Sequence, residues 1–311
     1  MLPLMPAPTI VDVITRTKNR PLLLRRCLAS LLSQNYVHWH WVVVNNGEAG
    51  PVESLLREFA ETLAGRVTLI GFFEPGLLGK LTNVGIAGSV NPLITLLDDD
   101  DTWHARFLEA TVPRLTSARL HESVRGVCTL SNCIHEKVDA DGRITVIKEY
   151  PFNPHLRNIH LASLAAVNQF PPNAFVYERR ALAEVGGYDE DLPVLDDWDF
   201  NLRFNFKFNI DVVYEELSNY HMRPETEAGE MANTVTAKEN LHRFYEGVIL
   251  NQHLRADLAG GRMGLGTLLA MANTRRVAES LLHTQRKKLE HMSDKIGKIN
   301  ARTQMIKNQL P

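Results

Sequence analysis

The chain has few cysteines, no long apolar run and no excess of charge of one sign. Its 311 residues include three cysteines, and 34 Lys and Arg stand against 36 Asp and Glu, for a formal net charge of −2. Three unpatterned cysteines give no disulfide framework and are typical of a reducing compartment. The charge balance gives no support to a nucleic-acid partner.

Targeting and membrane signals are also missing. No stretch approaches the roughly 20 apolar residues that a membrane-spanning helix needs. The segment Met1–Pro8 is broken by prolines and lacks the basic and then apolar order of a signal peptide. Cys128, Cys133 and His135 are close in sequence, but their spacing is not that of a zinc site. We therefore expect a cytoplasmic protein, with peripheral contact at the inner face of the membrane as its one membrane association.

Apolar segments alternate with segments of helical period through the first hundred residues. The expected strands and helices cover residues 10–15, 40–44, 67–72 and 93–97, and residues 21–34, 52–63 and 83–87, respectively. This alternation predicts an α/β fold, with a Rossmann-like, mostly parallel sheet and helices on both faces. Ligands of such sheets bind outside the carboxyl ends of the strands. The segments that follow the strands should therefore meet at one crevice.

The densest chemical signal is a run of four carboxylates, Asp98–Asp101, directly after a buried strand that begins at Leu93. Adjacent anions repel one another unless a cation lies among them. Carboxylate oxygens at the end of an α/β strand suit Mg²⁺ or Mn²⁺ that carries a phosphate-bearing ligand. A solvated acidic loop is the structural alternative, but it leaves the flanking motifs unexplained.

A second acidic motif follows a glycine pair. The pair belongs to Gly186-Gly187-Tyr188-Asp189-Glu190, and Asp196-Asp197-Trp198 comes a few residues later. Two glycines allow a turn that residues with a Cβ tolerate poorly. Asp196 or Asp197 then opens a helix, whose N-terminal dipole favours an anion. Aspartates that merely cap this helix are the structural alternative.

The order of these motifs resembles the nucleotide-binding half of the family 2 glycosyltransferases with the GT-A fold, of the bacterial surface-polysaccharide type. The matching pieces span about a hundred residues and are Val13–Arg20, Leu28–Gln34, Trp41–Gly47, Gly79–Gly85 and Leu97–Trp103. The resemblance implies an inverting, metal-dependent hexosyltransferase. It would move a sugar from a nucleotide-sugar donor, with a UDP-sugar as first choice, to a hydroxyl of a glycan or lipid-linked glycan, as in O-antigen or capsule synthesis.

The resemblance assigns the donor nucleotide to Thr15, Thr17, Asn45, Asn46, Lys80, Asn83, Asp98 and Asp99. Within this set the two threonines would line the nucleobase pocket and Lys80 would neutralise a phosphate. Asn45 and Asn46 depart from the family, which usually carries an acidic residue there. An amide both donates and accepts hydrogen bonds, so base binding survives while specificity for uracil is put in doubt. A solvated surface lysine is the alternative for Lys80.

The acidic run matches the DxD-type motif of that family. By this match Asp98 and Asp100 would bind Mn²⁺ or Mg²⁺, with His221 as an additional ligand and Arg223 as a diphosphate partner. Two registers of the motif overlap in the run, with Asp101 as a further acidic companion, so the metal-binding carboxylate stays open. Trp103 is expected to pack against the following helix rather than to contact a sugar.

The second acidic motif matches the acceptor side of the family, where the second member of the pair is the general base. That residue is Asp197, and a carboxylate suits the role because it can take the proton of the attacking hydroxyl. Residues 225–230 read as a loop that could cover the site.

The tail is predicted to be helical from about residue 236, with an interruption at Gly260-Gly261. Beyond it, side chains in steps of three and four from Leu268 to Leu310 form a heptad seam of roughly 65 Å. Residues 262–311 carry ten Lys and Arg against three Asp and Glu. We divide the chain into a GT-A domain (1–230), a helical linker (231–261) and a basic coiled-coil helix for homo-oligomerisation (262–311). Contact of this helix with an anionic membrane is the alternative.

Two other functions remain open. A catalytically silent, nucleotide-sugar-binding scaffold could work through its coiled coil, and the Asn45-Asn46 departure favours it. A nucleotidyltransferase on a related fold would need a glycine-rich loop after the first strand, and the segment from Arg16 to Arg20 contains no glycine.

Overall fold

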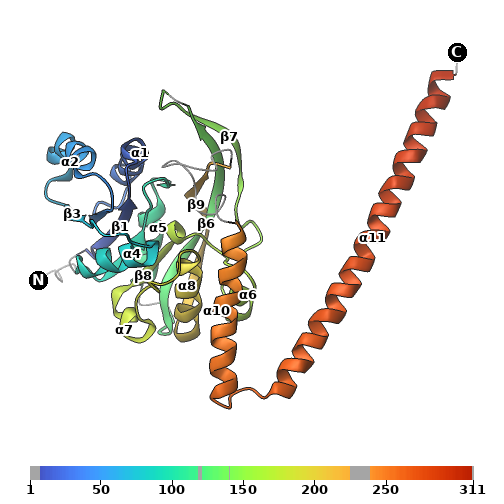
Figure 1. Cartoon of the computed structure of the whole chain (residues 1–311). Coiled ribbons are helices and arrows are strands. Elements are labelled where there is room, and N and C mark those ends of the chain that lie inside the picture. Colours follow the sequence, from blue (N-terminus) through green and yellow to red (C-terminus); the bar gives the residue numbers. More distant parts are fainter. Residues whose placement is uncertain (1–7, 118–120, 140, 225–238, 310–311) are drawn as a thin grey trace, which may run out of the picture. The chain divides into compact units, whose positions relative to one another are not determined.

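The computed structural model describes residues 8–117, 121–139, 141–224 and 239–309. The chain divides into two compact units, Met1–Glu246 and Gly247–Pro311. Among the described residues, the first unit holds a nine-stranded sheet with its helices (Figure 1). The predicted domain boundary at residue 230 and the predicted covering loop at 225–230 lie outside the described residues.

Four parallel strands form the first half of the sheet, in the order β3-β2-β1-β4. They are β1 (Val11–Thr17), β2 (Trp39–Asn45), β3 (Val67–Gly71) and β4 (Leu93–Leu96). Every residue of β1 and β4 is buried, as expected for strands covered on both faces. Thr17 at the end of β1 is in register with Asn45 at the end of β2, so the strands present their carboxyl ends at one edge.

Helices cover both faces of these strands, as predicted (Figure 1). One face carries Val13 and Trp41 and packs against α1, α2 and α5. The other face packs against α4, where a Cβ added at Gly85 would lie 2.5 Å from Ile14 Cγ2. The helices are α1 (Pro21–Leu32), α2 (Ala49–Glu58), α3 (Ala60–Leu63), α4 (Leu78–Ala87) and α5 (Phe107–Leu115).

The second half of the sheet is mixed in direction. Its strands are β5 (Thr102–Trp103), β6 (Val124–Val138), β7 (Ile144–Pro151), β8 (Phe175–Glu178) and β9 (Asn209–Met222). β8 runs antiparallel to both β4 and β6, whereas β9 runs parallel to β6. β5 and β7 pair antiparallel with β9 and β6. The α/β fold is thus as expected, and the described sheet is mixed: β3-β2-β1-β4 and the pair β6–β9 are parallel, whereas the other four pairings are antiparallel.

The second acidic motif begins a helix, as predicted. The elements of this region are α6 (Leu161–Ala166), α7 (Leu182–Val185), α8 (Asp196–Lys207) and the 3₁₀ turns η1 (Pro172–Ala174) and η2 (Arg179–Ala181). Aromatic contacts fix α8 on β8, because Phe204 meets Phe175 and Phe200 meets Tyr177 at ring distances of 5.1 and 5.3 Å. The residue before the helix, Leu195, has a left-handed backbone with φ of 66°.

Some expected elements have other bounds in the structure. The helix predicted over 52–63 is divided at Phe59 into α2 and α3. The helix expected from residue 83 begins earlier, at Leu78, because Gly79 allows close contact: a Cβ there would lie 2.3 Å from the Asp189 carbonyl oxygen. The late strand expected over 212–214 belongs to the longer β9, which also contains His221.

The tail is helical and is interrupted at the predicted place. α10 (Glu239–Ala259) and α11 (Leu265–Gln309) are separated by a turn in which Gly261 has a φ of 66°. Within the described part of the chain, no helix is both long and apolar enough to cross a membrane.

Candidate active site

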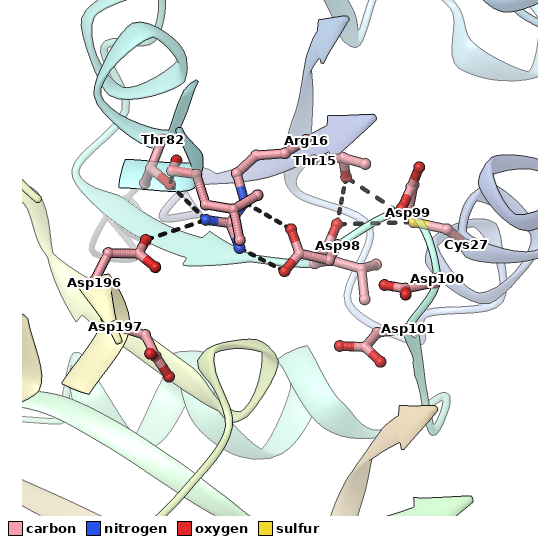
Figure 2. Close-up of polar contacts among 12 residues, drawn as sticks. Thr15, Arg16, Cys27, Thr82, Asp98, Asp99, Asp100, Asp101, Asp196 and Asp197 are labelled. Carbon is pink, nitrogen blue, oxygen red and sulfur yellow. Dashed lines mark hydrogen bonds and ion pairs between the residues drawn. The ribbon is translucent and has the colours of Figure 1, made fainter. Parts of the chain in front are cut away.

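The acidic run lies where the carboxyl ends of β1 and β4 meet. The backbone of Leu97 donates to the Ile14 carbonyl oxygen at 2.9 Å, which continues the β1–β4 pairing up to the first aspartate. Asp98 to Asp101 then turn away from the strand in succession (Figure 2). Four carboxylates are therefore held at the edge where an α/β sheet binds its ligands.

Arg16 is the central cation of the site. Its Nε and Nη2 donate to both oxygens of Asp98, at 2.8 and 2.6 Å. Its Nη1 donates to Thr82 at 3.1 Å and to Asp196 at 3.4 Å (Figure 2). Burial disfavours the charged guanidinium, but Asp98 and Asp196 together raise the pKa of Arg16 above its ordinary value. One buried cation therefore connects the two acidic motifs.

A second arginine, Arg20, neutralises the middle of the run. It contacts Asp99 through Nε at 3.0 Å and through Nη2, and it contacts Asp100 through Nη1 at 3.3 Å. Burial raises the pKa of Asp99 to about 7 despite Arg20. Burial would also raise the pKa of Asp100, but Arg20 and Arg223 hold it below its usual range. Burial therefore favours the neutral form of Asp99, whereas the two arginines favour the ionised form of Asp100.

A fully buried carboxylate, Glu136 on β6, organises the far side of the run. It accepts hydrogen bonds from Arg26 at 2.6 Å, Arg223 at 2.9 Å and His221 Nδ1 at 2.8 Å. Burial opposes its charge, yet the hydrogen bonds from His221 and Arg26 lower the pKa of Glu136 to about 2. Arg223 also contacts Asp100 through Nη2, so Glu136 indirectly positions the acidic run.

His221 is held by three hydrogen bonds that connect it to Glu136, Thr102 and Asp101. Its Nδ1 contacts Glu136 at 2.8 Å, its Nε2 contacts the Thr102 hydroxyl at 2.9 Å, and its backbone amide donates to Asp101 at 2.9 Å. Burial lowers the pKa of His221, so the ring is neutral at neutral pH. Both ring nitrogens are engaged by protein atoms, and His221 therefore does not offer a nitrogen to a metal ion in this arrangement.

The predicted general base, Asp197, lies in the first turn of α8 beside Asp196. Its Oδ2 accepts a hydrogen bond from Asn168 Nδ2 at 2.8 Å. Burial raises the pKa of Asp197. Burial also raises the pKa of Asp196, to about 7, although Arg16 opposes this. Asp196 is nearly inaccessible, whereas Asp197 is half-buried, so Asp197 is the member of the pair that a substrate can reach.

The two acidic motifs line one pocket of about 250 Å³. The donor-side wall includes Arg16, Thr17, Lys18, Arg20, Asn46, Asp98, Asp100 and Asp101, and the opposite wall includes Leu195, Asp196, Asp197 and Tyr220. Figure 2 shows Arg16 reaching from one motif to the other.

Half of the predicted nucleobase residues reach the pocket. Thr17 and Asn46 line it, and the Asn46 amide also donates to the carbonyl oxygens of Phe72 and Glu74, at 2.7 and 2.8 Å. Thr15 is fully buried, where it donates to the Leu97 carbonyl at 2.7 Å. Asn45 is buried and shapes the turn after β2, where its Nδ2 donates to the Glu48 carbonyl at 3.0 Å.

The predicted phosphate residues Lys80 and Asn83 are placed differently from each other. Lys80 lies 3.8 Å from Glu74 and over the Phe72 ring, beside the pocket rather than among its lining residues. Asn83 holds the loop after the glycine pair: its Nδ2 donates to the Tyr188 carbonyl at 2.8 Å, and its Oδ1 accepts from the Tyr188 amide at 2.9 Å. Its observed contacts position the second acidic motif.

The oxygen donors suit a divalent cation better than the predicted nitrogen does. Asp98, Asp100 and Asp101 all line the pocket, and carboxylate oxygens are the ligands that Mg²⁺ and Mn²⁺ prefer. Burial raises the pKa of Asp101 well above its ordinary value, which indicates a carboxyl group short of positive charge. As the described side chains stand, no group of three histidine, cysteine or acidic residues encloses a metal ion. The carboxylates that line the pocket therefore have the oxygen chemistry of the predicted metal site, and the assignment of its ligands stays a prediction.

Sequence reasoning missed four residues that organise the site: Arg16, Arg20, Glu136 and Asn168. Arg16 and Arg20 directly follow a buried strand, and this position is a signal that could have indicated them. Glu136 lies in a strand of otherwise ordinary pattern, and nothing local marks it. The expectation for Trp103 is confirmed, since its ring stacks on Phe107 at 4.3 Å.

Residues 12–121 match the family model described as Glycosyl transferase family 2. The chain is also similar to the O-antigen biosynthesis protein RfbC of Myxococcus xanthus, with 27% identity over 210 residues, or 62% of this chain. The chain spans 15% of the length of that relative.

The fold is similar to those of two solved structures with bound nucleotide sugars. S. aureus TarS 1-349 in complex with UDP-GlcNAc matches with a TM-score of 0.54 and 14% identity, over 80% of this chain and 72% of that one. The mannosyltransferase PcManGT from Pyrobaculum calidifontis, in complex with GDP-Man and Mn²⁺, matches with a TM-score of 0.52 and 17% identity, over 87% of this chain and 81% of that one. Residues 12–121, which include the first acidic motif, thus match the Glycosyl transferase family 2 model, and the fold as a whole is similar to those of these two structures.

Proposed function

We propose that the protein is an inverting, metal-dependent glycosyltransferase that moves a sugar from a nucleotide-sugar donor to a hydroxyl of an acceptor. The observation that carries this proposal is that Asp98, Asp100 and Asp197 line the same pocket. One set of carboxylates suits the donor diphosphate with its cation, and the other suits the removal of a proton. A single in-line displacement needs both groups, on opposite sides of the reacting carbon.

On the donor side, Thr17 and Asn46 would contact the nucleobase and ribose, and the basic residues Lys18 and Arg20 lie on the same wall. Mg²⁺ or Mn²⁺ held by Asp98 and Asp100 would neutralise the leaving nucleoside diphosphate. Arg16 holds the Asp98 carboxylate in place by donating a hydrogen bond to each of the two carboxylate oxygens. The donors named for the two structural neighbours are UDP-GlcNAc and GDP-Man, and we keep a UDP-sugar as first choice.

On the acceptor side, Asp197 would take the proton of the attacking hydroxyl. Its raised pKa makes it a stronger base than an ordinary aspartate, and Asn168 fixes the orientation of its carboxylate. The neighbouring Asp196 is tied to Arg16 and is nearly inaccessible, so it does not compete for the hydroxyl.

The acceptor we propose is a glycan or lipid-linked glycan of an O-antigen or capsule-type polysaccharide. The similarity to the M. xanthus O-antigen biosynthesis protein supports this class. Three free cysteines support a reducing, cytoplasmic location, with contact at the inner face of the membrane where a lipid-linked acceptor would lie.

The test combines donor binding with transfer. Thermal unfolding is measured with UDP-, GDP- and dTDP-sugars, each with Mn²⁺ and with EDTA. A ligand at a hundredfold excess over its dissociation constant adds about 2.7 kcal/mol of apparent stability. We expect one nucleotide class to shift the unfolding temperature, and we expect the shift to depend on Mn²⁺. Asp197→Asn should keep the shift and lose nucleoside diphosphate release, whereas Asp191→Asn, in an exposed position nearby, should keep both.

The scaffold alternative gives a different pattern. A silent module would bind a donor without releasing nucleoside diphosphate in the presence of any glycan acceptor, and Asp197→Asn would then change nothing. Equal transfer by the wild type and Asp197→Asn would contradict the assignment of the base.

A further inference from the structure

The tail helix α11 exposes an apolar seam over its described side chains, from Leu268 to Ile299. It is 45 residues long, against the 11–12 of an average helix. Most of its large apolar side chains are strongly exposed, among them Leu282 (70%), Leu289 (65%) and Ile296 (55%). A long isolated helix gains little stability from propensity alone and normally depends on packing of an apolar face. We propose that α11 forms a coiled coil with α11 of a second copy of this chain.

The spacing of the seam carries the proposal. Between residues 268 and 299, the side chains in alternating steps of three and four are Leu268, Met271, Arg275, Ala278, Leu282, Gln285, Leu289, Met292, Ile296 and Ile299. Steps of three and four average 3.5 residues, whereas a straight helix turns once in 3.6. A strict repeat of 3.5 keeps the seam facing a second helix that supercoils around the first.

A lipid surface explains this pattern less well. A helix that lies on a bilayer needs an apolar face but no 3.5 period, and such faces are commonly anchored by Trp or Phe. The segment from Leu265 to Gln309 contains no Trp, Phe or Tyr. A polar residue, Gln285, also lies in the seam, where a hydrocarbon surface would offer no hydrogen-bonding group to its amide.

Charge along the seam is partly balanced within each helix. Arg275 contacts Glu279 at 2.7 Å, and Arg286 contacts Glu290 at 3.0 Å, each four residues apart. Among the described basic side chains, Arg276, Lys287, Lys288 and Lys295 are exposed to solvent. Repulsion between solvated charges is screened over about 8 Å at physiological salt. A second basic helix can therefore approach the apolar seam.

The polar seam position Gln285 favours a partner of the same sequence. An amide both donates and accepts hydrogen bonds, so two glutamines that meet in register can satisfy each other. A single polar residue in a seam selects register at some loss of affinity. The second copy supplies this match without any further protein.

The experiment measures the mass of the full-length chain by light scattering during gel filtration, from 1 to 100 µM. We expect the wild type to elute at a multiple of 35.1 kDa and to approach the monomer mass on dilution. The double substitution Leu282→Asp/Leu289→Asp should elute at 35.1 kDa at every concentration. The matched control is Leu269→Asp/Val277→Asp, which places the same charges on exposed apolar positions outside the seam and should keep the wild-type mass.

A second variant and a vesicle assay keep the result decisive. Gln285→Leu should lower the concentration of half-dissociation at least tenfold. A wild type that stays at 35.1 kDa at 100 µM, or a seam variant that keeps the wild-type mass, would overturn the proposal. A monomeric wild type that sediments with phosphatidylglycerol vesicles would assign the seam to a membrane instead. None of these measurements uses a donor or acceptor, so they stand apart from the test of transfer.

Discussion

Arg16 on β1 donates to both oxygens of Asp98, at 2.8 and 2.6 Å, and Asp98 follows the neighbouring strand β4. The same guanidinium also donates to Asp196 at 3.4 Å, and Asp196 lies on a helix 180 residues later in the chain. The donor-side and acceptor-side motifs are thus parts of one electrostatic unit. A change at Arg16 should affect both.

Replacing Arg16 with Gln should lower the stability of the fold strongly. It leaves Asp98 and Asp196 without their cation, and breaking a buried ion pair from one side costs about 3–5 kcal/mol. Arg16→Lys keeps the charge but cannot form the two parallel hydrogen bonds, so its loss should be intermediate. Urea unfolding measures both variants.

The matched control for Arg16 is Arg25→Gln. Arg25 also contacts both oxygens of one carboxylate, Glu58, at 2.5 Å each, but both side chains are about half exposed. An exposed ion pair contributes about 0–1 kcal/mol. Equal losses for Arg16→Gln and Arg25→Gln would contradict the importance of burial at Arg16.

Transfer should depend on pH through Asp197. Its pKa is raised by burial, so the rate should begin to fall at a pH above the ordinary aspartate value of about 3.9. The rate falls on acidification because only the ionised carboxylate can accept a proton. Asp197→Asn should lower kcat by about 10²–10⁴. A pH–rate profile with the donor found in the binding test measures both effects.

Asn168 should tune that pH dependence. Its hydrogen bond to Asp197 stabilises the ionised form and lowers the pKa. Asn168→Ala should therefore move the acid limb of the profile to higher pH, with the donor affinity unchanged. A profile that stays in place while activity falls would show that Asn168 acts only through packing.

Removing the charge of Glu136 should destabilise the protein by about 3–5 kcal/mol at pH 7, because Glu136→Gln leaves Arg26 and Arg223 without this buried counter-charge. The pKa of Glu136 is depressed to about 2, so its contribution is present above the ordinary glutamate value of about 4.3. It is lost as the pH falls from there through about 2. Urea unfolding from pH 7 to 2.5 should show the gap between wild type and variant shrinking in that window, whereas Glu149→Gln, on the exposed β7, should show no gap.

Asn83→Ala should loosen the loop that carries the second acidic motif. The substitution removes two hydrogen bonds to the Tyr188 backbone and one to Glu190, and it should cost about 1–3 kcal/mol. Asn83→Asp keeps an acceptor for the Tyr188 amide but turns an oxygen towards the Tyr188 carbonyl and the Glu190 carboxylate, so its loss should be at least as large. If instead Asn83 acts only by contacting the nucleotide-sugar, both variants would weaken nucleotide binding and leave the unfolding midpoint unchanged.

Features that depend on local pattern were predictable from the sequence. Burial of the first strands, the start of a helix at Asp196 and the break at Gly260-Gly261 each follow from residues close in the chain. The alternation of β1 also held information about Thr15: it shares a face with Val11 and Val13, and that face is the one buried under α1. Its place in the core follows from the period of a strand.

Features that depend on distant partners were not predictable in the same way. Glu136 meets His221 and Arg223 more than 80 residues later, and a single sequence does not state which strands will pair. His221 could be a metal ligand by its chemistry. In the structure both of its nitrogens contact side chains, Glu136 and Thr102, that the β6–β9 and β5–β9 pairings bring close.

The contact between Arg223 and Asp100 has a consequence for the order in which the chain is made. A ribosome delivers the acidic run long before it delivers Arg223, and before the strand β8 that pairs with the open edge of β4. The segment 12–121, which carries the family match, therefore emerges with Arg16 and Arg20 beside its carboxylates but without the Arg223 contact, and with one edge of β4 unpaired. Synthesis must pass β8 before that edge is paired, and it must pass residue 223 before Asp100 gains its contact with Arg223.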